Sequence, residues 1–255
     1  MAYERGGESM KRFWTLYKVE QKLGLRCPDM LIFGVGMPVG VLVLIAVVAG
    51  NKTAGGSSYT FLQSAFASLM AVGICASAFM GIPLTVADYR DKKILKHFFV
   101  TPCTPMTLMS AIVACSVATA VLSGIAVTVV AAFVFQYRMK GSPFLFICSY
   151  LLVMTAMYSI GVFLAGLCKS VKMANVVTTA VYFPMLFLSG ATIPFELFPK
   201  GMQTVASVLP LTQGIKLMKQ ISMGDPVENA AGIIILMIAI TVICSLLSKF
   251  TFRWE

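Results

Sequence analysis

Long apolar stretches separated by short polar segments dominate the chain. Six of them have the length of a bilayer crossing, because an α-helix needs ~20 apolar residues to span ~30 Å of hydrocarbon. The predicted spans are residues 31–50, 59–86, 106–136, 143–168, 173–191 and 230–248. Late in the second span, Gly81-Ile82-Pro83 predicts a bend. The pattern predicts an all-α membrane protein, with six transmembrane helices in a single transmembrane domain over residues 1–255.

Residues 10–27, before the first predicted span, mix apolar and basic positions at helical spacing. One side of such a helix can hold Phe13, Leu16, Tyr17 and Leu23, while Lys11, Arg12, Lys18 and Lys22 stay in water. Basic amphipathic helices of this kind lie in the plane of the membrane interface. We therefore predict an interfacial helix over 10–27. It either anchors the chain to lipid or also contacts a partner, and the pattern favours neither alternative.

Residues 192–222 fit no single span, because Pro194, Pro199 and Pro210 interrupt an otherwise apolar segment. Two short helices dipping into the outer leaflet would reconcile the apolar character with the interruptions. Non-helical backbone at that depth is tolerated only against protein or a water-filled cavity. We predict an extracellular re-entrant hairpin here. Its lone carboxylate, Glu196, follows Pro194 in the way that charges begin helices, so the pattern alone favours a structural role for it.

The composition agrees with the bilayer as solvent. Of 255 residues, 58% are hydrophobic and 12% charged, against roughly a quarter charged in an ordinary soluble domain. The net charge of +10 lies in short segments between apolar runs, which argues against a nucleic-acid surface. Fourteen of the 20 Lys and Arg residues flank one side if both termini are cytoplasmic. The positive-inside rule then predicts a multi-pass protein of the cytoplasmic membrane with both termini in the cytoplasm.

The chemistry of enzymes and ion-coupled transporters is missing from the predicted spans. None of the ten acidic residues lies in the middle of a span, where ion-coupled transporters use carboxylates. The single histidine, His97, falls in a predicted cytoplasmic segment, and no Gly-Lys dipeptide is present to form a phosphate-binding loop. The seven cysteines contain no CxxC pair. We predict no catalytic residue, metal or cofactor in this chain, so that any uphill transport needs a nucleotide-binding subunit.

The predicted cytoplasmic segment 88–102 carries both charge signs and ends at Pro102. Its apolar residues, Ile94, Leu95, Phe98 and Phe99, recur at helical spacing. Proline then stops the helix. The segment is either a solvated turn with its apolar side on the membrane or a docking element. Its charge density and its proline stop favour docking.

The order of acidic residue, Arg, Lys, apolar pair and Thr-Pro before a long span resembles the permease subunits of type-2 ABC exporters. The matching residues are Asp88, Arg90, Lys93, Ile94, Leu95, Thr101 and Pro102. That family usually has glutamate and glycine where this chain has Asp88 and Lys93. The order of the elements agrees with the family over essentially the whole chain. The resemblance implies that this segment, with Phe98, is a coupling element that seats in a groove of an ATPase subunit.

The resemblance also implies an outer gate and a substrate pathway. In the family, a Ser-Gly, Pro, Pro and Leu-Pro pattern forms a re-entrant hairpin near the gate, here with Ser189, Gly190, Pro194, Glu196 and Pro210. The second and fifth spans line the pathway between two permeases. Their candidate wall residues are Phe61, Phe66, Met70, Phe79, Thr178, Tyr182, Phe183 and Phe187. Such a wall suits an amphiphilic drug, antibiotic, lipid or lipopeptide, although each residue could instead face lipid or pack between helices.

Pattern and resemblance together predict the permease subunit of an ATP-driven exporter. Its implied partners are two ABC ATPase subunits, which bind ATP and Mg²⁺, a second identical or homologous permease, and membrane lipid. A secondary transporter or channel without an ATPase is the first alternative, and it would require inverted repeats or polar residues in the membrane. A membrane enzyme acting on lipids is the second, and it lacks an acid-base constellation.

Overall fold

The computed structural model describes residues 2–24, 32–49, 60–94, 105–191, 195, 198–226 and 229–251. Every element in these ranges is helical. The helices are α1 (Ala2–Gly24), α3 (Met37–Ala49), α4 (Phe61–Ala76), α5 (Ile82–Asp91), α7 (Pro105–Val129), α8 (Pro143–Leu167), α9 (Val171–Leu188), α10 (Lys200–Val208), α11 (Pro210–Met223) and α12 (Ala230–Thr251). Three π-helical turns, η1 (Ile32–Gly36), η2 (Ser77–Gly81) and η3 (Val130–Val134), extend or join them.

Five helical stretches in the described ranges are long and apolar enough to cross a membrane. They cover Phe61–Asp91, Met106–Val134, Pro143–Leu167, Val171–Leu188 and Ala230–Thr251, and Gly34–Val48 forms a shorter apolar helix. The predicted all-helical membrane fold is confirmed. The first predicted span, 31–50, corresponds to the shorter helix. The second, predicted over 59–86, continues to Asp91 because its charged last turn remains helical.

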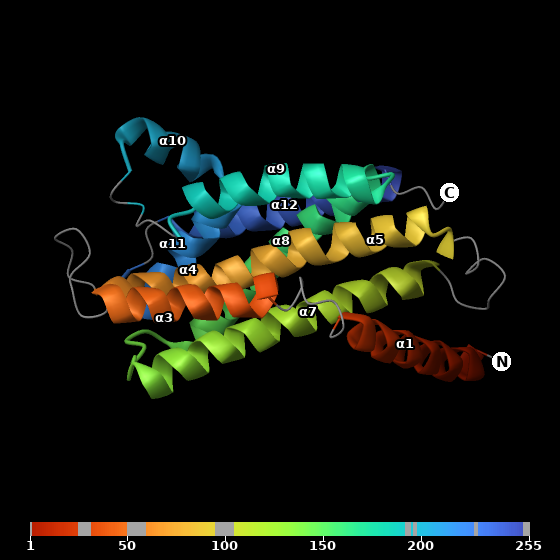
Figure 1. Ribbon diagram of the computed structural model, residues 1–255, viewed down its shortest axis with the longest axis horizontal. Coiled ribbons are helices and arrows are strands. Elements are labelled where there is room, and N and C mark those ends of the chain that lie inside the picture. Colours follow the sequence, from red (N-terminus) through yellow and green to blue (C-terminus); the bar gives the residue numbers. More distant parts are fainter. Residues whose placement is uncertain are drawn as a thin grey trace.

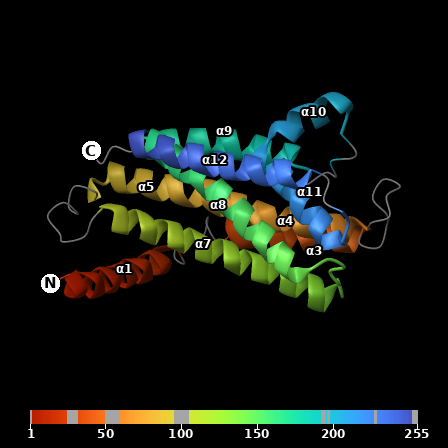
Figure 2. The same cartoon turned by 180° about the vertical axis from the view of Figure 1, so that it is seen from behind.

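The chain passes repeatedly between two ends of an elongated bundle. One end holds α1, the end of α5, the α8–α9 turn and the last turns of α12, and we call it the α1 end (Figures 1 and 2). The opposite end, called the α10 end, holds α10, the end of α3 and the connection between α7 and α8 (Figures 1 and 2). This alternation follows the order of apolar runs in the sequence.

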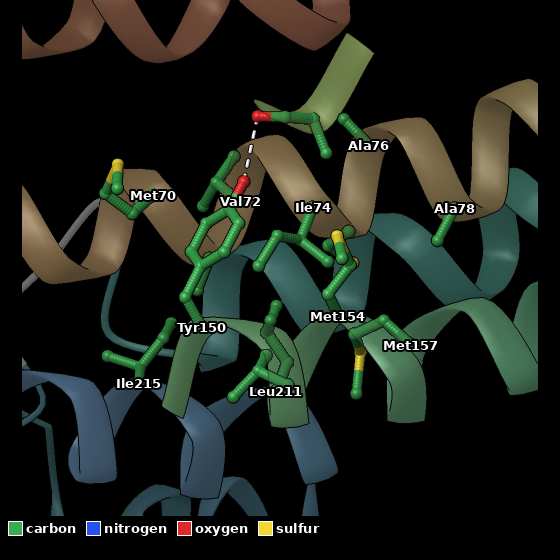
Figure 3. Packing of buried hydrophobic residues seen from close by; sticks show 14 of the residues in the cluster. Met70, Val72, Ile74, Ala76, Ala78, Tyr150, Met154, Met157, Leu211 and Ile215 are labelled. Carbon is green, nitrogen blue, oxygen red and sulfur yellow. Dashed lines mark hydrogen bonds between the residues drawn. The ribbon is translucent and has the colours of Figure 1, made fainter. Parts of the chain in front are cut away.

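α4 and η2 form the centre of the bundle, and nearly every residue of α4 is buried. Helices α3, α7, α8 and α11 pack around it. Figure 3 shows Met154 and Met157 of α8, with Leu211 and Ile215 of α11, near Ile74 of α4. Small side chains on α4 allow this close approach, which is the usual solution for helices packing in lipid.

Tyrosines of α8 join the central helices through their hydroxyl groups. Tyr150 donates to the carbonyl oxygen of Ala120 in α7 at 2.8 Å, the dashed line in Figure 3. Tyr158 donates to the carbonyl oxygen of Ser116 at 2.8 Å and lies 2.7 Å from the Ser77 hydroxyl. Ser77 begins η2, just before the Gly81-Ile82-Pro83 segment that predicts a bend. Hydrogen bonds of Tyr158 therefore join α7 and α8 to η2, the irregular turn of the central helix.

Local sequence signals fix several helix ends. Thr60 and Gln63 form a reciprocal capping box at the start of α4. Pro210 occupies the first turn of α11, where its missing N–H costs nothing. Gly224 ends α11 in the left-handed conformation, with φ of 78°.

Candidate functional site

Three consecutive residues at the end of α5, Tyr89, Arg90 and Asp91, each bond to a different part of the bundle. We call this turn the α5 junction. Tyr89 donates its hydroxyl to Glu20 Oε1 of α1 at 2.6 Å. Arg90 bonds to the end of α8, and Asp91 to the start of α9. The turn thus connects α1 with both sides of the α8–α9 connection.

The Arg90 guanidinium caps the C-terminal end of α8. Its Nη1 donates to the carbonyl oxygen of Ala165 at 2.8 Å and also to that of Cys168. The last carbonyls of a helix lack intrahelical partners, and the helix dipole places partial negative charge there. A cation is therefore well placed at this position, and it holds α5 and α8 together.

The Asp91 carboxylate lies at the opposite kind of helix end, the start of α9. Its Oδ2 accepts the N–H of Val171 at 2.9 Å. The Ser170 hydroxyl accepts the N–H of Met173 at 3.3 Å, as an N-cap residue does. Carboxylates stabilise helix N-termini because of the positive partial charge there. Arg90 and Asp91 therefore match their charges to the ends of α8 and α9.

Glu20 lies in the packed strip of α1, with only 6% of its surface exposed. Phe13, Leu16 and Tyr17 are half-buried on this side. Burial raises the pKa of Glu20 above its usual range, and the hydrogen bond from Tyr89 opposes that shift only in part. Leu23, also predicted on this side, lies seven residues after Leu16 and so at nearly the same angle around the helix. It is 46% exposed, so it contacts the bundle less than the other three residues.

The residues predicted to dock an ATPase differ in their surroundings. Asp88 forms an exposed ion pair with Lys92 at 2.8 Å, and Lys93 is exposed with φ of 56°. Arg90 is half-buried and bonds within the chain. Ile94 is half-buried, and Leu95, Phe98, Thr101 and Pro102 lie outside the described residues. A docking role stays a prediction for all of them, and Arg90 also makes separate contacts within this chain.

The predicted wall residues also divide, by their exposure. Phe66, Met70, Phe79, Thr178 and Tyr182 are buried inside the chain. The Phe66 ring lies 4.7 Å from that of Tyr137 and 5.7 Å from that of Phe146. Phe61 is half-buried. Phe183 and Phe187 lie on the surface of α9, stacked with their ring centroids 6.1 Å apart.

The exposed side of α9 carries polar groups within a candidate span. Asn175, Thr179, Phe183 and Phe187 follow one another at intervals of four residues and are all exposed, and we call them the α9 stripe. Pro184, also exposed, has no N–H to donate to the carbonyl four residues earlier. By contrast, the large exposed side chains of α12 from Ile234 to Leu247 are all apolar, and the exposed charge of Lys249 lies in its last turn.

Polar groups in a span are costly against hydrocarbon and are found against protein or water. The α9 stripe therefore suits a pathway or a partner, whereas the exposed side of α12 suits lipid. The contribution of Asn175 was not predicted from the sequence. Its spacing of four from Thr179, and of eight from Phe183, was the signal that could have identified it.

The predicted gate region forms two short helices, α10 and α11, which meet at Leu209. Ser189 is buried, Gly190 has φ of 82°, and Pro210 starts α11, while Pro194 and Glu196 lie outside the described residues. α11 packs against α4 and α8. A dip of this pair into the outer leaflet, and a gating role, stay predictions.

The connection between α7 and α8 holds the end of α11. The backbone N–H groups of Lys140 and Gly141 donate to the carbonyl oxygen of Ser222 at 3.2 and 3.3 Å. A Cβ atom at Gly141 would lie 1.7 Å from the carbonyl oxygen of Ile221, so only glycine fits this contact. The end of α11 is therefore fixed to the bundle.

No group of three or more His, Cys, Asp or Glu side chains that could hold a metal ion occurs within the described ranges.

Known proteins similar to this chain include a membrane transport permease. The sequence model of the family described as ABC-2 type transporter matches residues 11–223. Nodulation protein J of Rhizobium meliloti (strain 1021) is 28% identical over 217 residues, which is 85% of this chain and 79% of that protein. Nodulation protein J of Rhizobium leguminosarum bv. viciae is 27% identical over 222 residues, or 85% of this chain and 80% of that protein. Inner membrane transport permease YhhJ of Escherichia coli (strain K12) is 28% identical over 133 residues, covering 52% of this chain and 36% of that protein.

Proposed function

Because the chain belongs to the ABC-2 type transporter family, we propose that it is the permease of an exporter driven by a separate ABC ATPase. The predicted resemblance to this family is confirmed. The chain is a multi-pass membrane transport subunit, and permeases of its family normally pair with an ABC ATPase. The proposal adds export as the direction, two ATPases that bind ATP and Mg²⁺, and a second permease.

The α5 junction is the observation that carries the proposal. It lies at the α1 end, where the described part of the chain also has the exposed charges of Asp88, Lys92 and Lys93. A subunit that pushed on this end would act on α1, α8 and α9 through one helical turn. We assign the α1 end to the cytoplasm, in agreement with the bias of Lys and Arg along the sequence.

The α9 stripe supports a pathway between two permeases. Its Asn175 amide and Thr179 hydroxyl offer hydrogen bonds, and its two phenylalanine rings offer an apolar contact surface. An amphiphilic substrate needs both kinds of contact. We place the second permease opposite this face, so that the polar groups meet protein or water and not lipid.

The test is recovery of an ATPase with the tagged chain. The chain is purified from its host membranes, and ATP hydrolysis in the eluate is measured. The variant Lys92→Glu/Lys93→Glu reverses exposed charges at the α1 end, and Lys200→Glu is the matched control at the α10 end. We expect hydrolysis to be recovered with the wild type and the control and lost with the double variant.

Two results would contradict the proposal. If the wild-type eluate does not hydrolyse ATP, the chain does not associate with a separate ATPase. If ATP hydrolysis is recovered equally with the wild type, the double variant and the control, the ATPase does not dock through the charges beside the α5 junction.

A further inference from the structure

A hydrogen bond holds α1 to the bundle, in the packed strip of α1 that is otherwise apolar. α1 packs along α7, and Leu16 lies against the main core. In the middle of this strip, Tyr89 of α5 donates to Glu20 at 2.6 Å. The two residues are 69 positions apart in sequence, so the bond joins separate elements.

A carboxyl group at this position weakens the packing of α1 in one respect. Burying it costs desolvation that an apolar side chain of similar size would avoid. Apolar contacts between helices are non-directional and allow a helix to slide or roll along its neighbour. A short hydrogen bond is directional, and it fixes the position of α1 along α5.

The same helical turn fixes two further elements. Arg90 holds the end of α8, and Asp91 holds the start of α9. Tyr89, Arg90 and Asp91 are consecutive residues of α5, whose backbone hydrogen bonds make the turn stiff. A displacement of α1 that moves Tyr89 therefore moves the partners of Arg90 and Asp91 as well.

We propose that Glu20 and Tyr89 are positioning residues that transmit movement of α1 through α5 to the α8–α9 connection. The proposal rests on the proposed function, since the movement is supplied by the ATPase. It assigns to α1 the role of a lever, in addition to any contact with lipid. The α9 stripe begins one turn beyond Val171, so the lever reaches the proposed pathway wall directly.

Hydrogen exchange of the full complex in lipid nanodiscs tests the lever, with and without ATP and orthovanadate. Two segments report on it, residues 10–24 of α1 and residues 171–176 at the start of α9. The test variant is Tyr89→Phe, which removes one hydroxyl group. Tyr150→Phe is the matched control, because it removes a hydroxyl bonded at 2.8 Å elsewhere in the bundle.

Without nucleotide, we expect Tyr89→Phe to speed exchange in α1 about tenfold, the usual effect of one hydrogen bond of this kind. Tyr150→Phe should leave exchange in α1 unchanged. With ATP and orthovanadate, wild type and control should change exchange in both segments. Tyr89→Phe should change it in α1 alone. Glu20→Gln retains an oxygen acceptor and should keep the α9 response, whereas Glu20→Leu should lose it.

The outcomes separate the lever from the proposed function. If exchange in α9 responds to nucleotide in Tyr89→Phe and Glu20→Leu as it does in wild type, the lever is overturned and the proposed function stands. If wild type shows no response to nucleotide in either segment, both are overturned. A loss of the α9 response in Tyr150→Phe as well would also overturn the lever, because the effect would then follow from any lost hydroxyl.

Discussion

Arg90 has two possible roles: it was predicted to dock an ATPase, and its side chain bonds to the end of α8. Replacing Arg90 in the isolated chain tests the second role by itself. The structure shows Arg90 Nη1 bonded to the carbonyl oxygens of Ala165 and Cys168. If this contact matters for the permease itself, its loss must be measurable in the isolated chain. Arg90→Ala removes both bonds, and Arg90→Lys keeps the charge but replaces the guanidinium by a single ammonium group.

The size of the effect follows from the two bonds. A hydrogen bond from a charged donor contributes about 1.5–3 kcal/mol. Arg90 is only half-buried, so water competes for the carbonyls and the lower end of that range applies. Arg90→Ala should therefore destabilise the permease by about 3 kcal/mol, and Arg90→Lys by roughly half as much. For a domain of this size, 1 kcal/mol corresponds to about 2–4 °C in Tm. The expected fall for Arg90→Ala is about 6–12 °C.

The assay is thermal unfolding of the purified permease in nanodiscs, with no ATPase present. Asp88→Asn is the matched control one position before Tyr89, because it breaks an exposed i,i+4 ion pair with Lys92. Exposed pairs of this kind contribute about 0.3–0.5 kcal/mol, so Tm should change by about 2 °C at most. If Arg90→Ala unfolds at the same temperature as Asp88→Asn, the contact of Arg90 with the end of α8 contributes nothing to stability, which would contradict this prediction.

Three further predictions concern other contacts of the bundle. Gly161→Ala would place a Cβ atom 2.4 Å from a backbone carbonyl oxygen of η2, and overpacking should lower stability by about 1–3 kcal/mol. Gly201→Ala, with open space around it, should be neutral or stabilising in the same unfolding assay. Burial raises the pKa of Glu20 above its usual 4.5, so bundle-bound α1 binds the proton more tightly than released α1. Its attachment should weaken as pH rises through that raised pKa, and Glu20→Gln should flatten the pH profile of exchange in α1, once corrected for intrinsic rates. Tyr158→Phe leaves the buried carbonyl of Ser116 without this donor, and should lower the unfolding free energy by about 1–3 kcal/mol; an unchanged Tm would contradict this.

The helices of this protein follow closely from the apolar pattern. Length and apolar character locate the spans because the bilayer imposes both. Their ends are less predictable. The second span was expected to end near Val86, where the apolar residues stop, but its helix continues to Asp91. The charged last turn stays helical because Tyr89, Arg90 and Asp91 bond to neighbouring helices, and a one-dimensional pattern contains no such information.

Which side of a span faces inward could not be predicted in the same way. Lipid is as apolar as a protein core, so buried and lipid-facing positions have similar side chains. The predicted wall residues Phe66 and Phe79 are buried, whereas Phe183 and Phe187 are exposed, and their residue type does not distinguish them. Polar residues are more informative in this setting, as Asn175 on the exposed side of α9 shows.

The partners of the charged residues depended on tertiary structure. The sequence predicted docking for Arg90 because its neighbours are charged and a proline stop follows. In the structure, its guanidinium reaches the end of α8, 75 residues away. Glu20 was not selected from the sequence, although an acidic residue three and four positions after Tyr17 and Leu16 on a packed strip was a usable signal.

We propose that a separate ATPase, bound at the α1 end, moves this permease. Native mass spectrometry of the complex released from its host membrane measures this most directly. We predict a particle of two permeases and two ATPase subunits that carry a phosphate-binding loop. A particle that contains the permease without any such subunit would contradict it.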